Sequence, residues 1–179
     1  AVREVIDNGN MSSLNCPEEL YLSEKLIEMH PWADMVKIAR TGAEANAIAV
    51  RIARAYSGKE NIAVCGYHGW HDWYLSSNLS RDKKLGFHLF PGVQIKGVPR
   101  QLKRTSIPFF YGDLKELKQI IKKEKIGIIK MEVARFEKPN IHFLRNVRKL
   151  CDKNNIILIF DECTTGFREN YRGLHKTLG

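Results

Sequence analysis

The stretch that most constrains the fold is IILIFDECTTGFR, residues 156–168. Five large apolar residues in a row end in Phe160 and follow a helical pattern, which predicts a strand buried on both faces, as in a parallel sheet. Asp161 and Glu162 come directly after this strand. Ligands of open α/β sheets bind beyond the carboxyl ends of the strands, so Asp161 is a candidate functional acid. The alternative is that both acids only solvate a strand end.

Size and charge are those of an ordinary globular domain. The chain has 179 residues, of which 44% are hydrophobic and 27% charged, enough to bury one core. No apolar run approaches the roughly 20 residues that span a bilayer, and the first residues lack a secretory signal, which predicts a cytoplasmic protein without membrane contact. The +9 charge is spread without a nucleic-acid motif, and we interpret it as solvated surface that helps to attract anions.

Cysteine spacing argues against a zinc site and against a disulfide framework. The four cysteines are scattered, and none forms a CxxC pair. Reduced thiols are therefore expected, as is usual in the cytoplasm. The cysteines are Cys16, Cys65, Cys151 and Cys163.

Helical and strand patterns alternate along the chain. Helices are predicted at the first residues and over 17–30, 42–56, 113–125 and 143–154, and strands over 35–39, 62–65, 126–131 and 156–160. Residues 80–110 are rich in glycine and proline and are predicted to form a long functional or interfacial loop. The alternation predicts an α/β fold with a mainly parallel sheet between two helical layers, a three-layer αβα arrangement.

A second candidate site lies at Thr41-Gly42-Ala43, between a predicted strand and a predicted helix. The first N–H groups of a helix have no partner within the helix, so this turn is suited to bind an anion. Thr41 is also a good helix N-cap, and simple capping is the alternative.

The segment from Tyr67 to Tyr74, YHGWHDWY, is unusually rich in aromatic residues for a connection after a strand. Rings beside glycines suit stacking on a flat ligand, whereas burial of Trp70 and Trp73 in a core or subunit interface is the alternative. A metal site built from the two histidines and Asp72 lacks a further ligand pair with metal spacing, so no metal is expected.

Four motifs together resemble the class III pyridoxal-phosphate aminotransferases, most closely the branch similar to glutamate-1-semialdehyde aminomutase. They are TGAEA at 41–45, YHG at 67–69, Glu132 after a strand, and FDECTTGFR at 160–168. The resemblance covers essentially the whole chain and implies the large domain of a fold type I transferase. It also implies a homodimer that uses pyridoxal 5'-phosphate and acts on a small amino donor and a carbonyl compound.

The resemblance also implies which residues contact the cofactor. An acid beside the pyridine nitrogen would keep that nitrogen protonated, so that the ring can act as an electron sink. The implied contacts are Thr41, Gly42 and Ala43 at the phosphate, Tyr67 and Cys163 on the two ring faces, His68 and Glu132 lining the site, and Asp161 at the ring nitrogen.

The sequence departs from the family pattern in four places. Thr41-Gly42-Ala43 replaces the usual serine-glycine-threonine and loses one hydroxyl, and Cys163 stands where valine is usual. After Glu132, VARFE replaces the expected proline and glycine-bearing loop, so the substrate is not carried over from the family. The lysine that binds the cofactor covalently is expected beyond Gly179. We therefore expect residues 1–179 to be a partial large domain, without the N-terminal segment, the lysine region and the small domain, and to be inactive alone.

Two other functions are compatible with parts of this pattern. A dinucleotide-binding domain also has strand-turn-helix units and terminal acids, but no GxGxxG follows a strand here. An α/β ligand-binding or interaction module could retain the fold without catalysis. Conversion of bound pyridoxal phosphate to its pyridoxamine form by an amine would favour the enzyme, and binding alone would favour the module.

Overall fold

The computed structural model describes residues 2–8, 16–79, 94–134 and 137–178, within two units, residues 1–40 and 41–179. The first unit contains helices α1 (Val2–Asn8) and α2 (Pro17–Met29), close to the predicted positions. Pro17 suits the first turn of α2 because its missing N–H would have no helical partner. Across the described helices, none is long and apolar enough to cross a membrane.

The prediction of a strand at residues 35–39 is wrong. These residues have no regular secondary structure, and Met35 is 87% exposed. A strand is stabilised by a hydrogen-bonded neighbour and by burial of one face, and no strand in the described ranges pairs with this segment.

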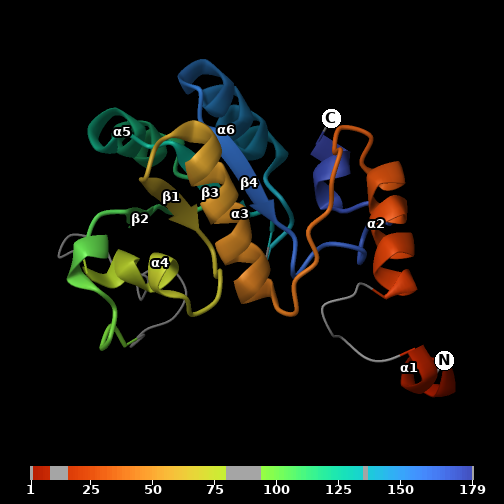
Figure 1. The fold of residues 1–179 in the computed structure, drawn as a ribbon. Helices are drawn as coiled ribbons and strands as arrows, with labels where there is room; N and C mark the ends of the chain where they lie inside the picture. The colour runs from red at the N-terminus through yellow and green to blue at the C-terminus, as the bar shows by residue number, and fades with distance from the viewer. Residues whose placement is uncertain (1, 9–15, 80–93, 135–136, 179) are drawn as a thin grey trace. The chain divides into compact units, whose positions relative to one another are not determined.

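The second unit is built on a four-stranded sheet of order β2-β1-β3-β4, in which every pair of neighbours is parallel (Figure 1). The strands are β1 (Ile62–Cys65), β2 (Ser106–Pro108), β3 (Ile128–Glu132) and β4 (Ile157–Asp161). The predicted parallel α/β sheet is therefore confirmed. The carboxyl ends of its strands meet at one edge of the sheet, because parallel strands all run in the same direction.

The helices of this unit are α3 (Gly42–Ser57), α4 (Asp72–Leu75), α5 (Leu114–Glu124) and α6 (Ile141–Asn154). Short 3-10 turns are η1 (Ser76–Leu79), η3 (Arg100–Leu102) and η4 (Leu174–Leu178). Helix α6 begins at Ile141 rather than at Phe143, because Asn140 Oδ1 accepts the Phe143 N–H at 3.0 Å and caps the helix.

Two hydrophobic clusters cover the two faces of the sheet. On one face, residues of α5 and α6 pack against alternate residues of β1 and β3, and on the other face α3 and α4 pack against the remaining ones. The first cluster includes Leu117, Ile120, Phe143, Val147, Ala63, Ile129 and Met131, and the second includes Val50, Ala53, Trp73, Tyr74, Ile62, Val64 and Ile128. Helices on both faces confirm the three-layer αβα arrangement (Figure 1).

Two further expectations about strands require correction. Ser106–Pro108, predicted as part of a long loop, forms β2, since pairing with β1 decides its conformation and an edge strand tolerates proline. Residues 80–93 of that loop lie outside the described residues. Strand β4, predicted to be buried on both faces, is only half-buried over Ile157–Phe160, because among the described strands it pairs with β3 alone.

Candidate functional site

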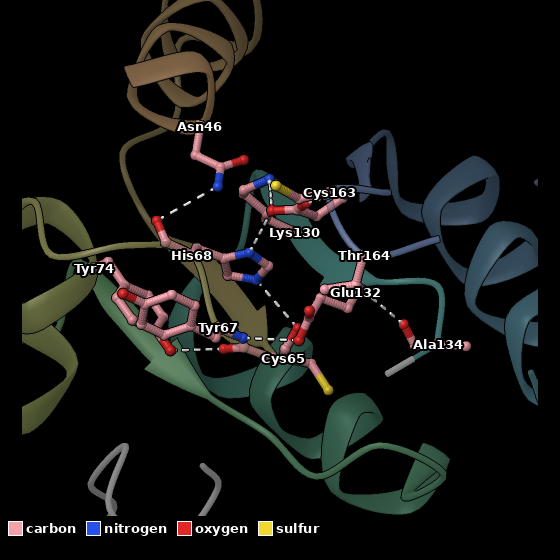
Figure 2. A network of polar contacts seen from close by, with 12 residues as sticks. Asn46, Cys65, Tyr67, His68, Tyr74, Lys130, Glu132, Ala134, Cys163 and Thr164 are labelled. Atoms are coloured by element: carbon pink, nitrogen blue, oxygen red, sulfur yellow. Dashed lines mark hydrogen bonds and ion pairs between the residues drawn. The ribbon is translucent and has the colours of Figure 1, made fainter. Parts of the chain in front are cut away.

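The carboxyl ends of β1, β3 and β4 bring together residues that are far apart in the sequence. These strands end in Cys65, Glu132 and Asp161, and all of them are buried. The loop after β1 carries Tyr67 and His68 over this edge, as Figure 2 shows. Two of the predicted motifs and both predicted acids therefore meet in one place.

Two glycines allow the loop after β1 to approach its neighbours closely. A Cβ added at Gly66 would lie 2.5 Å from Glu132 Oε2, and one added at Gly69 would lie 2.6 Å from the Cβ of Ala43. Both glycines also have positive φ, +103° and +97°, which disfavours other residues. The loop thus contacts β3 and the first turn of α3, and the Tyr67 N–H donates to Glu132 Oε2 at 2.9 Å.

The Asp161 carboxylate is held by contacts on both of its oxygens. Oδ2 lies 2.9 Å from Nδ1 of His68 and 3.4 Å from Nζ of Lys130, and Oδ1 accepts the Cys163 N–H at 3.0 Å. Burial raises the pKa of Asp161, but the hydrogen bond from His68, the charge of Lys130 and the Cys163 N–H outweigh it. The pKa of Asp161 therefore lies well below its ordinary value, and the group is ionised at neutral pH.

His68 connects this carboxylate to the backbone of β1. Its side chain is buried, and its second ring nitrogen, Nε2, lies 3.1 Å from the Cys65 carbonyl oxygen (Figure 2). Asn46 of α3 donates from Nδ2 to the His68 carbonyl at 3.4 Å. Burial lowers the pKa of His68, although the hydrogen bond to Asp161 opposes this effect.

Other predicted site residues are exposed at the same edge. Tyr67 is 39% exposed, and its ring meets that of Tyr74 edge-on at 6.1 Å between centroids. The Tyr74 hydroxyl donates to the Gly66 carbonyl at 2.7 Å, which fixes the start of the loop. Cys163 is also exposed, and a Cβ added at Gly42 would lie 3.1 Å from its Sγ. The start of α3 therefore adjoins the segment that follows β4.

Thr41 is the N-cap of α3, as one of the two predictions for this turn requires. Its Oγ1 accepts the Glu44 N–H at 3.2 Å, and its carbonyl accepts the Ala45 N–H at 3.0 Å. The capping role is thereby confirmed. The backbone N–H groups of Gly42 and Ala43 belong to the first turn, whose N–H groups have no helical acceptor. Anion binding at this turn stays a prediction.

Substitution of Thr41 separates the two roles. Thr41→Ala removes the cap and is expected to lower the free energy of unfolding by about 1 kcal/mol, whereas Thr41→Ser, which keeps the hydroxyl, should lose much less. Urea unfolding of the ligand-free variants measures this difference. A weaker affinity of Thr41→Ala for pyridoxal phosphate, beyond its change in stability, would show that the hydroxyl also binds an anion. Equal stability of the two variants would contradict the capping role.

Sequence patterns failed to identify Lys130 as part of this site. It lies in β3, for which the sequence predicts only a strand over 126–131, and its side chain is only 1% exposed. A lysine in the middle of IGIIKMEV was the available signal, because a buried lysine needs a compensating acid. Lys130 and Asp161 lie 31 positions apart in the sequence, so local patterns did not identify the partner.

Glu162 and Trp73 have structural roles that the sequence left open. Glu162 accepts the Leu174 N–H at 2.6 Å and the His175 N–H at 2.9 Å, and also contacts the His175 ring, so it fixes the start of η4 rather than only solvating a strand end. Trp73 is buried in the core, as the alternative reading of the aromatic segment stated, whereas Trp70 is 71% exposed.

The arrangement is chemically suited to a ligand with a protonated ring nitrogen and a phosphate. Asp161 is a buried anion, and the Cys163 N–H uses only one of the two acceptor positions of its Oδ1. The start of α3 offers N–H groups to an anion, and the exposed ring of Tyr67 offers an apolar face. These features of the structure fit pyridoxal phosphate.

Comparisons with known proteins agree with this chemistry. The profile described as Aminotransferase class-III matches residues 1–170. The chain is 34% identical over 187 residues to 3-aminobutyryl-CoA aminotransferase of Cloacimonas acidaminovorans, with 99% of this chain and 41% of that protein covered. It is 33% identical over 187 residues to glutamate-1-semialdehyde 2,1-aminomutase of Syntrophobacter fumaroxidans, with 100% of this chain and 42% of that protein covered.

Solved structures show the same relationship. An omega-transaminase from Sphaerobacter thermophilus superposes with a TM-score of 0.80 at 25% identity, over 99% of this chain and 42% of that one. The chain thus spans less than half the length of the relatives it matches. Pyridoxal phosphate is the cofactor of the class III aminotransferase family, as the resemblance implied. Since the profile covers all the motifs at this edge of the sheet, the chain belongs to the class III aminotransferase family.

Proposed function

We propose that residues 1–179 carry the cofactor-contacting part of a pyridoxal-phosphate enzyme that moves an amino group, either between two molecules or within one. The observation that carries this proposal is the buried, ionised Asp161, held on both oxygens at the carboxyl end of β4. Relatives named as an aminotransferase and as an aminomutase support both forms of the reaction.

Asp161 has the central role in this proposal. Bound pyridoxal phosphate supplies an electron sink for the negative charge that develops when a substrate carbon loses its proton. Asp161 would hold a proton on the ring nitrogen, since an anion in a site of low dielectric strongly favours a protonated base beside it. The Cys163 N–H and His68 keep the carboxylate from turning away from that position.

The remaining predicted residues would bind and orient the ring. Thr41, Gly42 and Ala43 would bind the phosphate through the first turn of α3. Tyr67 would pack on one face of the ring and Cys163 on the other. Glu132 fixes the Tyr67 backbone through its 2.9 Å hydrogen bond and would therefore orient the stacking ring.

We further propose that the enzyme is a cytoplasmic homodimer that acts on a small amino donor and a carbonyl compound. The four cysteines are free thiols, which suits a reducing compartment. Trp70, 71% exposed beside the candidate site, is a residue that a second subunit could cover.

Titration of the purified protein with pyridoxal phosphate tests the proposed function. We expect saturable binding, detected through the near-visible absorbance of the cofactor and quenching of tryptophan fluorescence. The residue that binds the cofactor covalently is expected beyond Gly179, so residues 1–179 alone should not convert the cofactor to its pyridoxamine form when an amine is added. A longer chain that includes that lysine should.

Each outcome of this titration has a distinct meaning. Absence of saturable binding by the folded protein would contradict the proposed function. Binding without conversion by the longer chain would instead support a ligand-binding module. Conversion by residues 1–179 alone would show that a lysine within this range can act, contrary to the proposal.

A further inference from the structure

Lys130 is a buried lysine between apolar neighbours on the two adjacent strands. Side chains alternate along β3, so Ile128, Lys130 and Glu132 share one face of the sheet. This is the face that α3 covers, where Ile128 packs in the core. In register, Lys130 lies between Val64 of β1 and Ile159 of β4, both apolar. An apolar residue would be expected at this position.

The Asp161 carboxylate compensates for the charge of Lys130. Nζ of Lys130 lies 3.4 Å from Oδ2 of Asp161, and their side chains are only 1% and 5% exposed. Burial lowers the pKa of Lys130, while Asp161 and the nearby Glu132 raise it and so support the charged form. Removal of either member of such a pair leaves an uncompensated buried group. The two residues therefore act as one unit between β3 and β4.

His68 and Lys130 contact the same oxygen of the Asp161 carboxylate, Oδ2. The two ring nitrogens of His68 face two acceptors, Asp161 Oδ2 at 2.9 Å and the Cys65 carbonyl at 3.1 Å, so only a doubly protonated ring donates to both. The charge of Lys130 opposes this protonation. The titratable groups that interact with His68 and Lys130 here are Glu132, Asp161 and Cys163, and the ring of Tyr74 lies 5.5 Å from that of His68.

We propose that Lys130 is a positioning residue that holds the Asp161 carboxylate from β3 and shares its negative charge with His68. As a consequence, Lys130 limits how strongly Asp161 can hold a proton on a ring nitrogen. This second clause rests on the proposed function, whereas the first concerns the protein alone. Lys130 acts through Asp161 and is not itself proposed to contact the cofactor.

Lys130→Met tests the first clause, because methionine retains much of the apolar stem without the charge. We expect the pKa of His68, measured by NMR titration of its ring protons without cofactor, to rise by about one unit or more. Lys149→Met, which removes a charge from an exposed position of α6, is the matched control and should leave His68 unchanged. An unchanged His68 pKa in Lys130→Met would overturn the proposal, since a merely structural lysine has no such effect.

A measurement on the unmodified protein covers the case in which Lys130→Met does not fold. The side-chain Cε and Nζ resonances of Lys130 report its charge directly. A charged Lys130 at pH 7 that loses its proton below the usual pH of lysine supports the proposal. A neutral Lys130 throughout the range from about pH 6 to 8 would overturn it.

Cofactor binding tests the second clause. Without Lys130, the pKa of the ring nitrogen of bound pyridoxal phosphate should be higher. Pyridoxal phosphate is therefore expected to bind Lys130→Met about tenfold more tightly for each unit by which the pKa of this nitrogen rises. Unchanged or weaker binding by a folded Lys130→Met would overturn this clause. If the wild-type protein binds no pyridoxal phosphate, the proposed function and this clause both fall, and the His68 titration alone decides the positioning role.

Discussion

Asp161→Asn is expected to abolish measurable binding of pyridoxal phosphate and to lower the free energy of unfolding by about 3 kcal/mol. Asparagine has nearly the same shape but no charge, so it cannot hold a proton on a ring nitrogen. It also leaves the buried ammonium of Lys130 without its anion, which accounts for the loss of stability. Fluorescence titration with pyridoxal phosphate and urea unfolding measure the two effects separately.

A double variant shows that the two effects have different origins. Combining Asp161→Asn with Lys130→Met removes the uncompensated cation and should recover part of the lost stability, but it should not recover cofactor binding. If Asp161→Asn bound pyridoxal phosphate as tightly as the wild type, the assignment of Asp161 to the ring nitrogen would be wrong. Recovery of binding in the double variant would contradict it equally.

The same substitution predicts a change in the dependence of stability on pH. The pKa of Asp161 is lower in the folded protein than its ordinary value, so its contribution is present above about pH 4 and is lost as the pH falls toward the folded value. The difference in unfolding free energy between wild type and Asp161→Asn should therefore shrink steadily below about pH 4. A difference that stays constant in acid would show that the charge of Asp161 does not cause it.

Gly69→Ala is expected to disturb the site more than an exchange of glycine for alanine that carries the same kind of backbone strain but meets no neighbouring atom. Its new Cβ would lie 2.6 Å from Ala43 Cβ and 3.1 Å from Ala43 Cα, so the loop after β1 or the start of α3 must move. Overlap of this kind costs about 1–3 kcal/mol beyond the strain of a positive φ. Because residues on both sides of the contact are proposed to bind the cofactor, affinity for pyridoxal phosphate should fall as well.

Gly112→Ala is the matched control for this prediction. Gly112 also has a positive φ, +88°, but an added Cβ would meet nothing within 4 Å. Gly112→Ala should therefore show only the backbone strain, about 1–2 kcal/mol, and retain the affinity for the cofactor. Urea unfolding and cofactor titration of both variants provide the comparison. Equal losses of stability would mean that the loop is not held against α3 at Gly69.

Elements with strong local signals could be predicted from the sequence. Pro17, the Thr41 cap, Asp113 and Gly58 mark helix boundaries through interactions within a few residues, and the structure confirms them. Strands depend on neighbours that are distant in the sequence. Residues 35–39 have a strand pattern but no strand partner in the described part of the chain, whereas Ser106–Pro108 lacked such a pattern and is paired by β1.

Residues of the candidate site could be predicted where they lie at the end of a strand or beside a glycine turn. The motifs at Thr41, Tyr67, Glu132 and Asp161 were visible because each interrupts a regular pattern. The contacts between these motifs could not be predicted in the same way. The hydrogen bond between His68 and Asp161, for example, depends on the pairing of both β1 and β4 with β3. Lys130 was missed for the same reason, since only its neighbour on β4 explains its burial.

The separation in sequence of the residues around Asp161 also has a consequence for how the protein folds. The contact between His68 and Asp161 joins residues 93 positions apart, and the one between Tyr67 and Glu132 joins residues 65 positions apart. Such long-range contacts form slowly, because large chain segments must close before any gain is realised. We therefore expect the site to be assembled late, after the parallel strands have paired. During refolding, cofactor binding would report completion of the native sheet rather than formation of its helices.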